Sequence, residues 1–212
     1  PMIKKVVDNI NCNPLTCKYI FVVQKAHYEK YCLNYILNLI APGCEIVQVD
    51  GLTQGAACTS LCAEKFIDND EHLLFANSDQ ILEWDVNEFL YSMISNEIDG
   101  GISTFTADDK KWSYVKVNEN GYVTEVAEKK VISNKATTGI YFWNKGSDFV
   151  KYAKRMISDD NNRVNNEFYV CPIFNEMIKD NKKIKIFDAN KMWGIGTPED
   201  LNFYKQYFNQ SK

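Results

Sequence analysis

The chain of 212 residues is 45% hydrophobic and 25% charged, a composition that suits one globular domain without a stabilising metal or disulfide. Its formal net charge of −4 argues against a nucleic-acid-binding protein, which needs a basic surface, but allows a local pocket for one anionic metabolite. No apolar run has the length of a membrane span, and no secretory leader is recognisable. We therefore expect neither a nucleic-acid nor a membrane partner.

The seven cysteines are odd in number, and their spacings fit no zinc pattern. We interpret them as small buried side chains with free thiols. Free thiols in this number indicate a reducing compartment, and we expect a cytoplasmic protein.

In the first half of the chain, segments with helical spacing alternate with short apolar runs. Met2, Ile3 and Val6 recur at helical spacing, whereas residues 19–23 form a continuous apolar run typical of a strand buried on both faces. On the same criteria we predict helices over residues 2–10, 27–40, 56–66 and 86–95, and strands over residues 19–23, 44–49, 72–76 and 100–105. This alternation indicates parallel strands.

The second half of the chain adds antiparallel strands. Two segments rich in β-formers flank the polar turn Asn118–Gly121, which predicts a hairpin. We predict strands over residues 114–117, 123–126, 137–143 and 184–187, and helices over residues 148–157, 167–178 and from 197 onward. The expected fold is therefore α/β, one domain over residues 1–212, with a mixed, mainly parallel sheet, helices on both faces and a small hairpin region.

Asp79 follows a predicted buried strand within the sequence Asn77-Ser78-Asp79-Gln80. In open α/β sheets, ligands bind beyond the carboxyl ends of the strands. A carboxylate at such a position can bind Mg²⁺, which proteins hold with one or two carboxylates together with substrate phosphates. The alternative is an ordinary turn, since Asn, Ser and Asp all favour turns. The tetrapeptide alone leaves both interpretations open.

The segment Asp50–Ala57 joins a predicted strand to a predicted helix. Glycine allows a ligand to approach the backbone, and the start of the helix offers free N–H groups. The Gln54 side chain carries both a donor and an acceptor for a nucleobase. Ordinary turn chemistry is the alternative here.

Charged residues gather after the second strand of the predicted hairpin, at Glu125, Glu128, Lys129 and Lys130. A carboxylate suits sugar hydroxyls, and an ammonium suits a phosphate. A solvated sheet edge is the alternative. His27 and His72 lie in separate segments without a nucleophile beside them, so a hydrolase triad has little support.

Taken together, these motifs resemble the sugar-phosphate nucleotidyltransferases, whose best-known members are the glucose-1-phosphate thymidylyl- and uridylyltransferases. The likeness runs in order along nearly the whole chain. It is closest to members linked to bacterial capsule and surface-polysaccharide synthesis. The matching segments are Pro1-Met2-Ile3 with the helix that follows it, Thr53-Gln54-Gly55-Ala56-Ala57, Asn77-Ser78-Asp79, Glu128-Lys129, Ala136–Phe142, Glu167-Phe168-Tyr169 and Trp193–Leu201.

The resemblance implies a Rossmann-like, GT-A-type fold and the transfer of a nucleoside monophosphate from an NTP to a phosphorylated acceptor, above all a sugar 1-phosphate, with release of pyrophosphate. It implies Mg²⁺ on Asp79 and contact of Lys129 with the acceptor phosphate, so these two are the catalytic candidates. The candidate nucleotide-binding residues are Gln54, Gly55, Ala56, Asn77 and Ser78. The candidate acceptor-binding residues are Ser113, Glu128, Lys129, Thr138 and Gly139.

Two departures from the family stand out. The family's opening strand, G-x-G-x-R phosphate loop and catalytic lysine precede its "KPMI" segment and are not found in these 212 residues. We expect either that the sequence is part of a longer protein or that this domain cannot do the chemistry unaided. The second departure is Gly194, where family members often carry another metal aspartate. Asp79 would then share Mg²⁺ with phosphates and water, or with Asp188 or another acid.

Two rival functions remain. A GT-A-type glycosyltransferase normally carries an Asp-x-Asp motif, whereas Asp79 is followed by Gln80-Ile81. A degenerate, non-catalytic nucleotide-binding domain would account for both departures. The closing helix could pack on the domain or on a second chain. Packing on the domain is the default expectation, and a homo-oligomer stays open.

Overall fold

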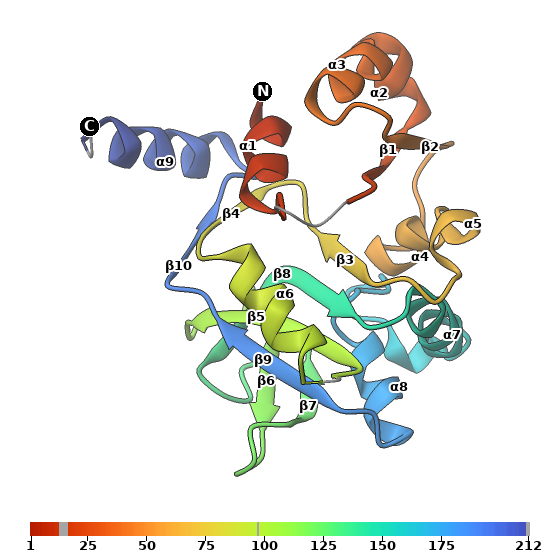
Figure 1. The fold of residues 1–212 in the computed structure, drawn as a ribbon, viewed down its shortest axis with the longest axis vertical. Helices are drawn as coiled ribbons and strands as arrows, with labels where there is room; N and C mark the ends of the chain where they lie inside the picture. The colour runs from red at the N-terminus through yellow and green to blue at the C-terminus, as the bar shows by residue number, and fades with distance from the viewer. Residues whose placement is uncertain (13–16, 97, 211–212) are drawn as a thin grey trace.

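The computed structural model describes residues 1–12, 17–96 and 98–210. Within these ranges, six strands form the main sheet, in the order β7-β6-β8-β5-β9 with β3 paired to β8 (Figure 1). The strands are β3 (Leu73–Ala76), β5 (Gly100–Thr106), β6 (Tyr114–Val117), β7 (Val123–Ala127), β8 (Lys135–Trp143) and β9 (Ile184–Asp188). The predicted strands and the hairpin of β6 and β7 are thus confirmed.

The sheet is mixed, as predicted, but antiparallel pairing dominates in the described residues. β5 and β9 are parallel, whereas β8 runs antiparallel to β3, β5 and β6. The expectation of a mainly parallel sheet therefore needs correction. The physical reason is that β8 inserts between β3 and β5, which the strand–helix alternation of the first half did not reveal.

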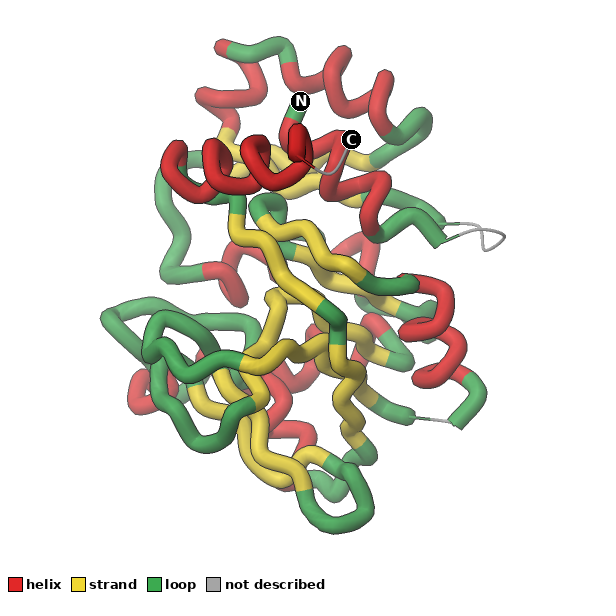
Figure 2. Tube along the Cα trace, turned by 90° about the vertical axis from the view of Figure 1, so that its left-hand side faces the viewer, coloured by secondary structure: helices red, strands yellow, loops and turns green. Residues whose placement is uncertain are grey.

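The two faces of the main sheet are covered by different helices. Side chains of a strand alternate between faces, so Tyr141 and Trp143 pack on one side and Ile140 and Phe142 on the other. The first side is covered by α7 (Gly146–Ile157) and α8 (Ile173–Lys179), and the second by α6 (Val86–Ile94). Figure 2 shows the strands running through the middle of the molecule with helices outside them. The predicted helices on both faces are confirmed.

A separate two-stranded parallel sheet contains β1 (Ile20–Gln24) and β2 (Glu45–Val49). β1 is only partly buried, because β2 is its one partner in this sheet. The predicted helix over residues 27–40 is two helices, α2 (Lys25–Lys30) and α3 (Leu33–Ile40). Cys32 has a φ of 50°, a left-handed conformation that interrupts the helical path. This unit lies at the top of Figure 1.

A third small sheet pairs β4 (Gln80–Glu83) with β10 (Lys191–Gly194), and neither strand was predicted. Its side chains pack with α1 (Met2–Asn9) and α9 (Pro198–Gln210) around Trp193 and Tyr204. The amide of Asp200 donates to the Thr197 hydroxyl at 3.2 Å, which confirms the helix start there. Tyr204 is buried against its own domain, while Phe203 is 65% exposed. Whether α9 also meets a second chain stays a prediction.

Three other sequence-based expectations are wrong. The segment 56–66 is not one helix but α4 (Ala56–Leu61) and α5 (Glu64–Ile67), separated by a turn. The predicted helix over residues 167–178 begins only with α8 at Ile173, and residues 167–172 are not helical. The backbones of Val164 and Glu167 bond to each other across a tight turn at its predicted start. Cys12 and Cys17 form a disulfide, so the expectation of free thiols holds only for Cys32, Cys44, Cys58, Cys62 and Cys171. None of the helices in the described ranges is long and apolar enough to cross a membrane.

Candidate functional site

The strands β3, β5 and β9 run in the same direction, because β3 and β5 are both antiparallel to β8 and β9 is parallel to β5. Their carboxyl ends therefore meet at one edge of the main sheet. Asp79 lies in the turn between β3 and β4 at this edge. The edge is where ligands bind in open α/β sheets, so the topology places Asp79 as the sequence predicted.

Asp79 is a partly buried carboxylate. Burial raises the pKa of its carboxyl above the ordinary value, against the opposing effect of a backbone hydrogen bond, and no charged side chain among the described residues is a cause of the shift. An ionised, partly desolvated carboxylate of this kind favours a cation beside it. Asp79 could therefore hold one Mg²⁺ together with phosphate oxygens. Among the described residues, no group of three or more metal-binding side chains lies together, so the protein itself offers a sparse ligand set.

The segment after β10 fixes the backbone around Asp79. The amide of Ile195 donates to the Asp79 carbonyl at 2.8 Å. A Cβ atom placed on Gly196 would lie 2.5 Å from the Asp79 carboxylate, whereas one placed on Gly194 would meet nothing within 4 Å. Gly196 therefore leaves room for the Asp79 side chain, and position 194, where the family often has an aspartate, has open space.

Asp188 does not lie near Asp79. It ends β9, and β9 is separated from β3 by β5 and β8, which is three strand spacings or about 14 Å. Its carboxylate also accepts a hydrogen bond from Thr104 at 2.8 Å and pairs with Lys135 at 2.7 Å. The expectation that Asp188 could serve as the second metal carboxylate is therefore not supported.

Asn77 and Gly139 meet across β3 and β8. The Asn77 amide donates to the Gly139 carbonyl at 3.1 Å, and the Asn77 side chain donates to Gln80 at 3.3 Å. Gly139 has a φ of +80°, and a Cβ atom there would collide with both polar side chains. Thr138 beside it is fully buried, and its hydroxyl donates to the Ser103 carbonyl at 3.3 Å. The Thr138 side chain therefore lies in the interior of the sheet. Ser78, in contrast, is exposed and precedes Asp79 in the turn.

Glu128 lies at the end of β7 and accepts a hydrogen bond from the Ser113 hydroxyl. The Ser113 carbonyl in turn accepts from the Thr137 amide at 2.8 Å, so Ser113 joins Glu128 to the strand that carries Gly139. Burial raises the pKa of the Glu128 carboxyl, against the opposing effects of Ser113 and Lys129. The structure thus brings Ser113 and Glu128 together beside β8.

Lys129 reaches from the end of β7 to Tyr169. Its ammonium donates to the Tyr169 hydroxyl at 2.5 Å and lies 4.6 Å from the centre of that ring. The hydrogen bond to Tyr169 is the main cause that raises the pKa of Lys129, with smaller contributions from Glu128 and Glu167. Lys129 therefore stays cationic beside Glu128, as contact with a phosphate requires.

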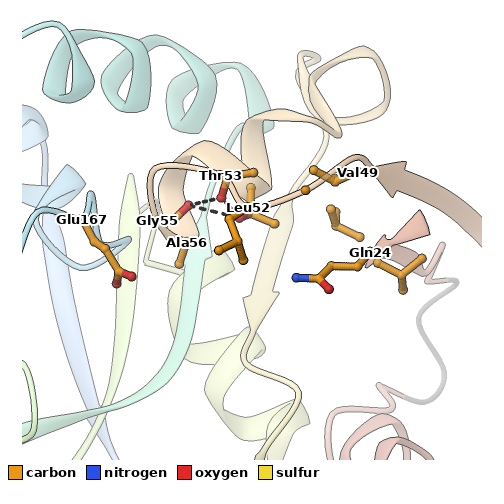
Figure 3. Close-up of a pocket in the computed structure, with 11 residues that line it drawn as sticks. Gln24, Val49, Leu52, Thr53, Gly55, Ala56 and Glu167 are labelled. Carbon is orange, nitrogen blue, oxygen red and sulfur yellow. Dashed lines mark hydrogen bonds between the residues drawn. The ribbon is translucent and has the colours of Figure 1, made fainter. Parts of the chain in front are cut away.

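A pocket of about 280 Å³ lies beyond the carboxyl ends of β1 and β2 (Figure 3). Gly55 and Ala56, two of the nucleotide-binding candidates, line it. The Gln54 side chain instead accepts a hydrogen bond from Arg163 at 2.6 Å. Figure 3 shows Gln24 and Glu167 on opposite sides of the loop residues. Gln24 belongs to no motif of the sequence analysis, whereas Glu167 belongs to the matching segment Glu167-Phe168-Tyr169, without an assigned role. The rest of the lining is Val22, Val23, Val49, Gly51, Leu52, Thr53 and Thr59.

Residues 51–57, which we call the pocket loop, lie against a tight turn formed by residues 164–167. Asn165 and Asn166 have φ values of 49° and 65°, the left-handed conformation of a two-residue hairpin turn. Just beyond the turn, the Phe168 amide donates to Gln54 at 2.8 Å, and the Phe168 carbonyl accepts from Ala57 at 3.0 Å. This turn was missed because the apolar spacing of the following residues favoured a helix, although the pair Asn165-Asn166 was a turn signal.

The predicted site residues thus form one continuous path. The pocket loop binds the segment with Phe168 and Tyr169, and Tyr169 contacts Lys129. From Glu128 the path continues through Ser113, residues 137–139 and Asn77 to the turn with Asp79. Residues that lie up to about half the chain apart in sequence therefore share one edge of the molecule.

The fold is thus α/β with a mixed sheet, and both the pocket and Asp79 lie beyond the carboxyl ends of strands. Residues 1–209 match the family model described as nucleotidyl transferase. The chain belongs to the nucleotidyl transferase family.

Solved structures with the same fold include several sugar-nucleotide enzymes. A nucleoside-diphosphate-sugar pyrophosphorylase from Vibrio cholerae RC9 superposes with a TM-score of 0.79 at 19% identity, covering 96% of this chain and 85% of that one. A UDP-glucose pyrophosphorylase in complex with UDP-glucose gives 0.75 at 16%, covering 100% and 88%. A protein described as a glucose-1-phosphate thymidylyltransferase from Bacillus anthracis, in complex with a sucrose, gives 0.73 at 16%, covering 98% and 82%. A search of curated proteins found no significant match.

Proposed function

We propose that the protein transfers a nucleoside monophosphate from an NTP to a phosphorylated acceptor, above all a sugar 1-phosphate, and releases pyrophosphate. The observation that carries this proposal is the continuous path from the pocket loop through Lys129 to Asp79. The path connects a pocket of about 280 Å³, the Lys129 ammonium and the Asp79 carboxylate, which in this proposal receive the nucleoside, the acceptor phosphate and the metal. The finer proposal is that the product serves surface-polysaccharide synthesis and that the enzyme is cytoplasmic.

Each residue on the path has a role in this proposal. Gly55 and Ala56 line the place of the nucleoside, and Asn77 and Ser78 border the bound nucleotide. Lys129 contacts the acceptor phosphate, and Glu128 accepts a hydrogen bond from an acceptor hydroxyl. Ser113, Thr138 and Gly139 shape the acceptor site, Thr138 through its buried bond to the neighbouring strand.

Asp79 would hold Mg²⁺, which when bound neutralises phosphate charge. The side chains of the protein align the two substrates. Lys129 presents the acceptor so that a phosphate oxygen attacks the α-phosphorus of the NTP, and the bond to pyrophosphate breaks in line. Catalysis then consists of positioning and charge neutralisation, without a covalent intermediate on the protein.

The proposal is tested on the full-length protein, by measuring pyrophosphate release from CTP, UTP, dTTP, GTP and ATP, each with Mg²⁺ and a panel of sugar 1-phosphates and other phosphorylated acceptors. We expect turnover with at least one pair. Asp79→Asn should abolish it, because loss of the charged metal ligand removes several kcal/mol of charge stabilisation. Lys129→Ala should raise the acceptor KM by more than the NTP KM.

The outcomes also separate the rival functions. Release of a nucleoside diphosphate from a nucleotide sugar would favour a glycosyltransferase. Nucleotide binding by calorimetry without turnover on any acceptor would favour a non-catalytic domain. Near-normal turnover by folded Asp79→Asn would end the proposed role of this residue. As a control, Asp68→Asn changes an exposed carboxylate outside the path and should leave turnover unchanged.

A further inference from the structure

Tyr169 makes two separate contacts with Lys129 in the described structure. Its hydroxyl accepts a hydrogen bond from the ammonium at 2.5 Å, and its ring lies 4.6 Å from the same nitrogen. A charge-assisted hydrogen bond and a cation–π contact together restrict a long side chain that would otherwise sample many rotamers. The ammonium is thus held in one place before any substrate arrives.

The backbone of Lys129 also restricts where its side chain can go. Lys129 has a φ of 52°, a left-handed conformation that is uncommon for a residue with a Cβ atom. Such conformations persist where the surrounding structure enforces them, and they gather at functional sites. Here the conformation turns the chain just after Glu128. Glu128 can therefore contact Ser113, while Lys129 contacts Tyr169.

Tyr169 is itself carried by a rigid segment. The residues on either side, Phe168 and Val170, are buried, and Phe168 bonds through its backbone to the pocket loop at Gln54 and Ala57. Tyr169 therefore has a fixed position relative to both the pocket and Lys129. A partner on such a support can set the position of the ammonium with little freedom.

From these contacts we propose that Tyr169 is a positioning residue that holds the Lys129 ammonium where the acceptor phosphate binds. This inference rests on the proposed function and adds a residue to it. Tyr169 does not touch the reacting atoms. It orients Lys129 so that the lysine side chain is already ordered when the acceptor arrives, which lowers the entropic cost of binding.

The experiment compares Tyr169→Phe and Tyr169→Ala with the wild type, using the NTP and the sugar 1-phosphate that give the highest turnover. Tyr169→Phe keeps the ring and removes the hydrogen bond. We expect the acceptor KM to rise about tenfold, as for the loss of one hydrogen bond to a charged group, with little change in the NTP KM. Tyr169→Ala should have a larger effect, because the ring contact is lost as well.

A double-mutant cycle with Lys129→Ala separates positioning from a merely structural role. If Tyr169 acts through Lys129, Tyr169→Phe should change the acceptor KM little in the Lys129→Ala background. The matched control is Tyr152→Phe, which removes a similar lysine contact, 3.3 Å from Lys151, on α7 outside the site. It should leave both KM values unchanged.

Two results would overturn the inference. One is an unchanged acceptor KM in Tyr169→Phe, and the other is the same loss with and without Lys129. If Lys129→Ala itself leaves the acceptor KM unchanged, the proposed role of Lys129 fails instead. Thermal unfolding of every variant identifies any loss that comes from the fold.

Discussion

At the scale of single residues, Asp79 combines partial burial with a pKa shift to which no charged side chain in the described part of the chain contributes. The buried Glu176 differs in having cationic partners: it is 5% exposed and pairs with Arg155 at 2.6 Å and with Lys179. Burial acts to raise its pKa, but the hydrogen bonds from these partners outweigh burial and lower it. Cationic side chains neutralise the structural carboxylate of Glu176, whereas the Asp79 carboxylate is available to a bound cation.

This contrast leads to a prediction about stability and pH. The raised folded-state pKa means that the folded protein binds this proton more tightly than the unfolded chain, so the wild type loses stability as pH rises through that pKa. Asparagine does not ionise, so Asp79→Asn should melt at a higher temperature than the wild type at neutral pH. The gain should disappear as the pH falls through the raised pKa toward the ordinary value of 3.8.

The measurement is thermal unfolding from pH 3.5 to pH 8 without metal or nucleotide, so that the pH values bracket the ordinary carboxyl pKa of about 4. Asp68→Asn is the matched control, since Asp68 is exposed. A melting temperature of Asp79→Asn that is equal to or below that of the wild type at neutral pH would contradict the interpretation that burial destabilises the ionised Asp79 carboxylate.

At the scale of elements, the site depends on how the pocket loop meets the segment that contains Phe168. Gly55 makes this contact possible: its φ is +121°, and a Cβ atom there would lie 2.5 Å from the Phe168 carbonyl oxygen. Two backbones can come this close only where one side chain is absent. Gly55 thus permits the two backbone hydrogen bonds by which Phe168 contacts Gln54 and Ala57.

We expect Gly55→Ala to destabilise the protein and to raise the NTP KM, because the loop must move away from Phe168. Gly43→Ala is the control: Gly43 has a φ of +78°, but a Cβ atom there would meet nothing within 4 Å. Both variants carry backbone strain, and only Gly55→Ala adds the collision. Urea unfolding should therefore show an extra loss of about 1–3 kcal/mol for Gly55→Ala. Equal losses would mean that the contact with Phe168 is unimportant.

At the scale of the whole molecule, the described structure contains one six-stranded sheet and two two-stranded sheets. The main sheet is covered on both faces, and its central strands β5 and β8 are largely buried. The β1–β2 pair has two strands and only partial burial. A two-stranded sheet has little independent stability. The contacts of β1 and β2 with α2 and with the residues around the pocket therefore have to support it.

This difference predicts uneven opening. In hydrogen exchange without ligand, amides of β1 and β2 should exchange faster than those of β5 and β8. Because the pocket is lined by Val22, Val23 and Val49, addition of Mg²⁺ with the NTP that gives turnover should protect β1 and β2 selectively. Equal protection of both sheets, or no response of β1 and β2 to nucleotide, would show that the pair is not the nucleotide-sensitive part.

The sequence determined most of the local structure, because apolar spacing and turn chemistry act over a few residues. The runs before Asn77 and before Asp50 are strands, the turn at Asn118–Gly121 closes a hairpin, and Thr197 begins the last helix. It also indicated the family, which the match over residues 1–209 shows. That residues 1–212 act as one domain stays a prediction.

Only the tertiary structure decided how these pieces meet. The insertion of β8 between β3 and β5, the pairing of β4 with β10 and the turn at Asn165-Asn166 depend on contacts between distant segments. The same holds for the partner of Lys129, since Tyr169 lies 40 positions further along the chain. Side-chain partners across such distances follow from packing, which local sequence patterns do not report. These long-range contacts bring the pocket loop, Lys129 and Asp79 to one edge.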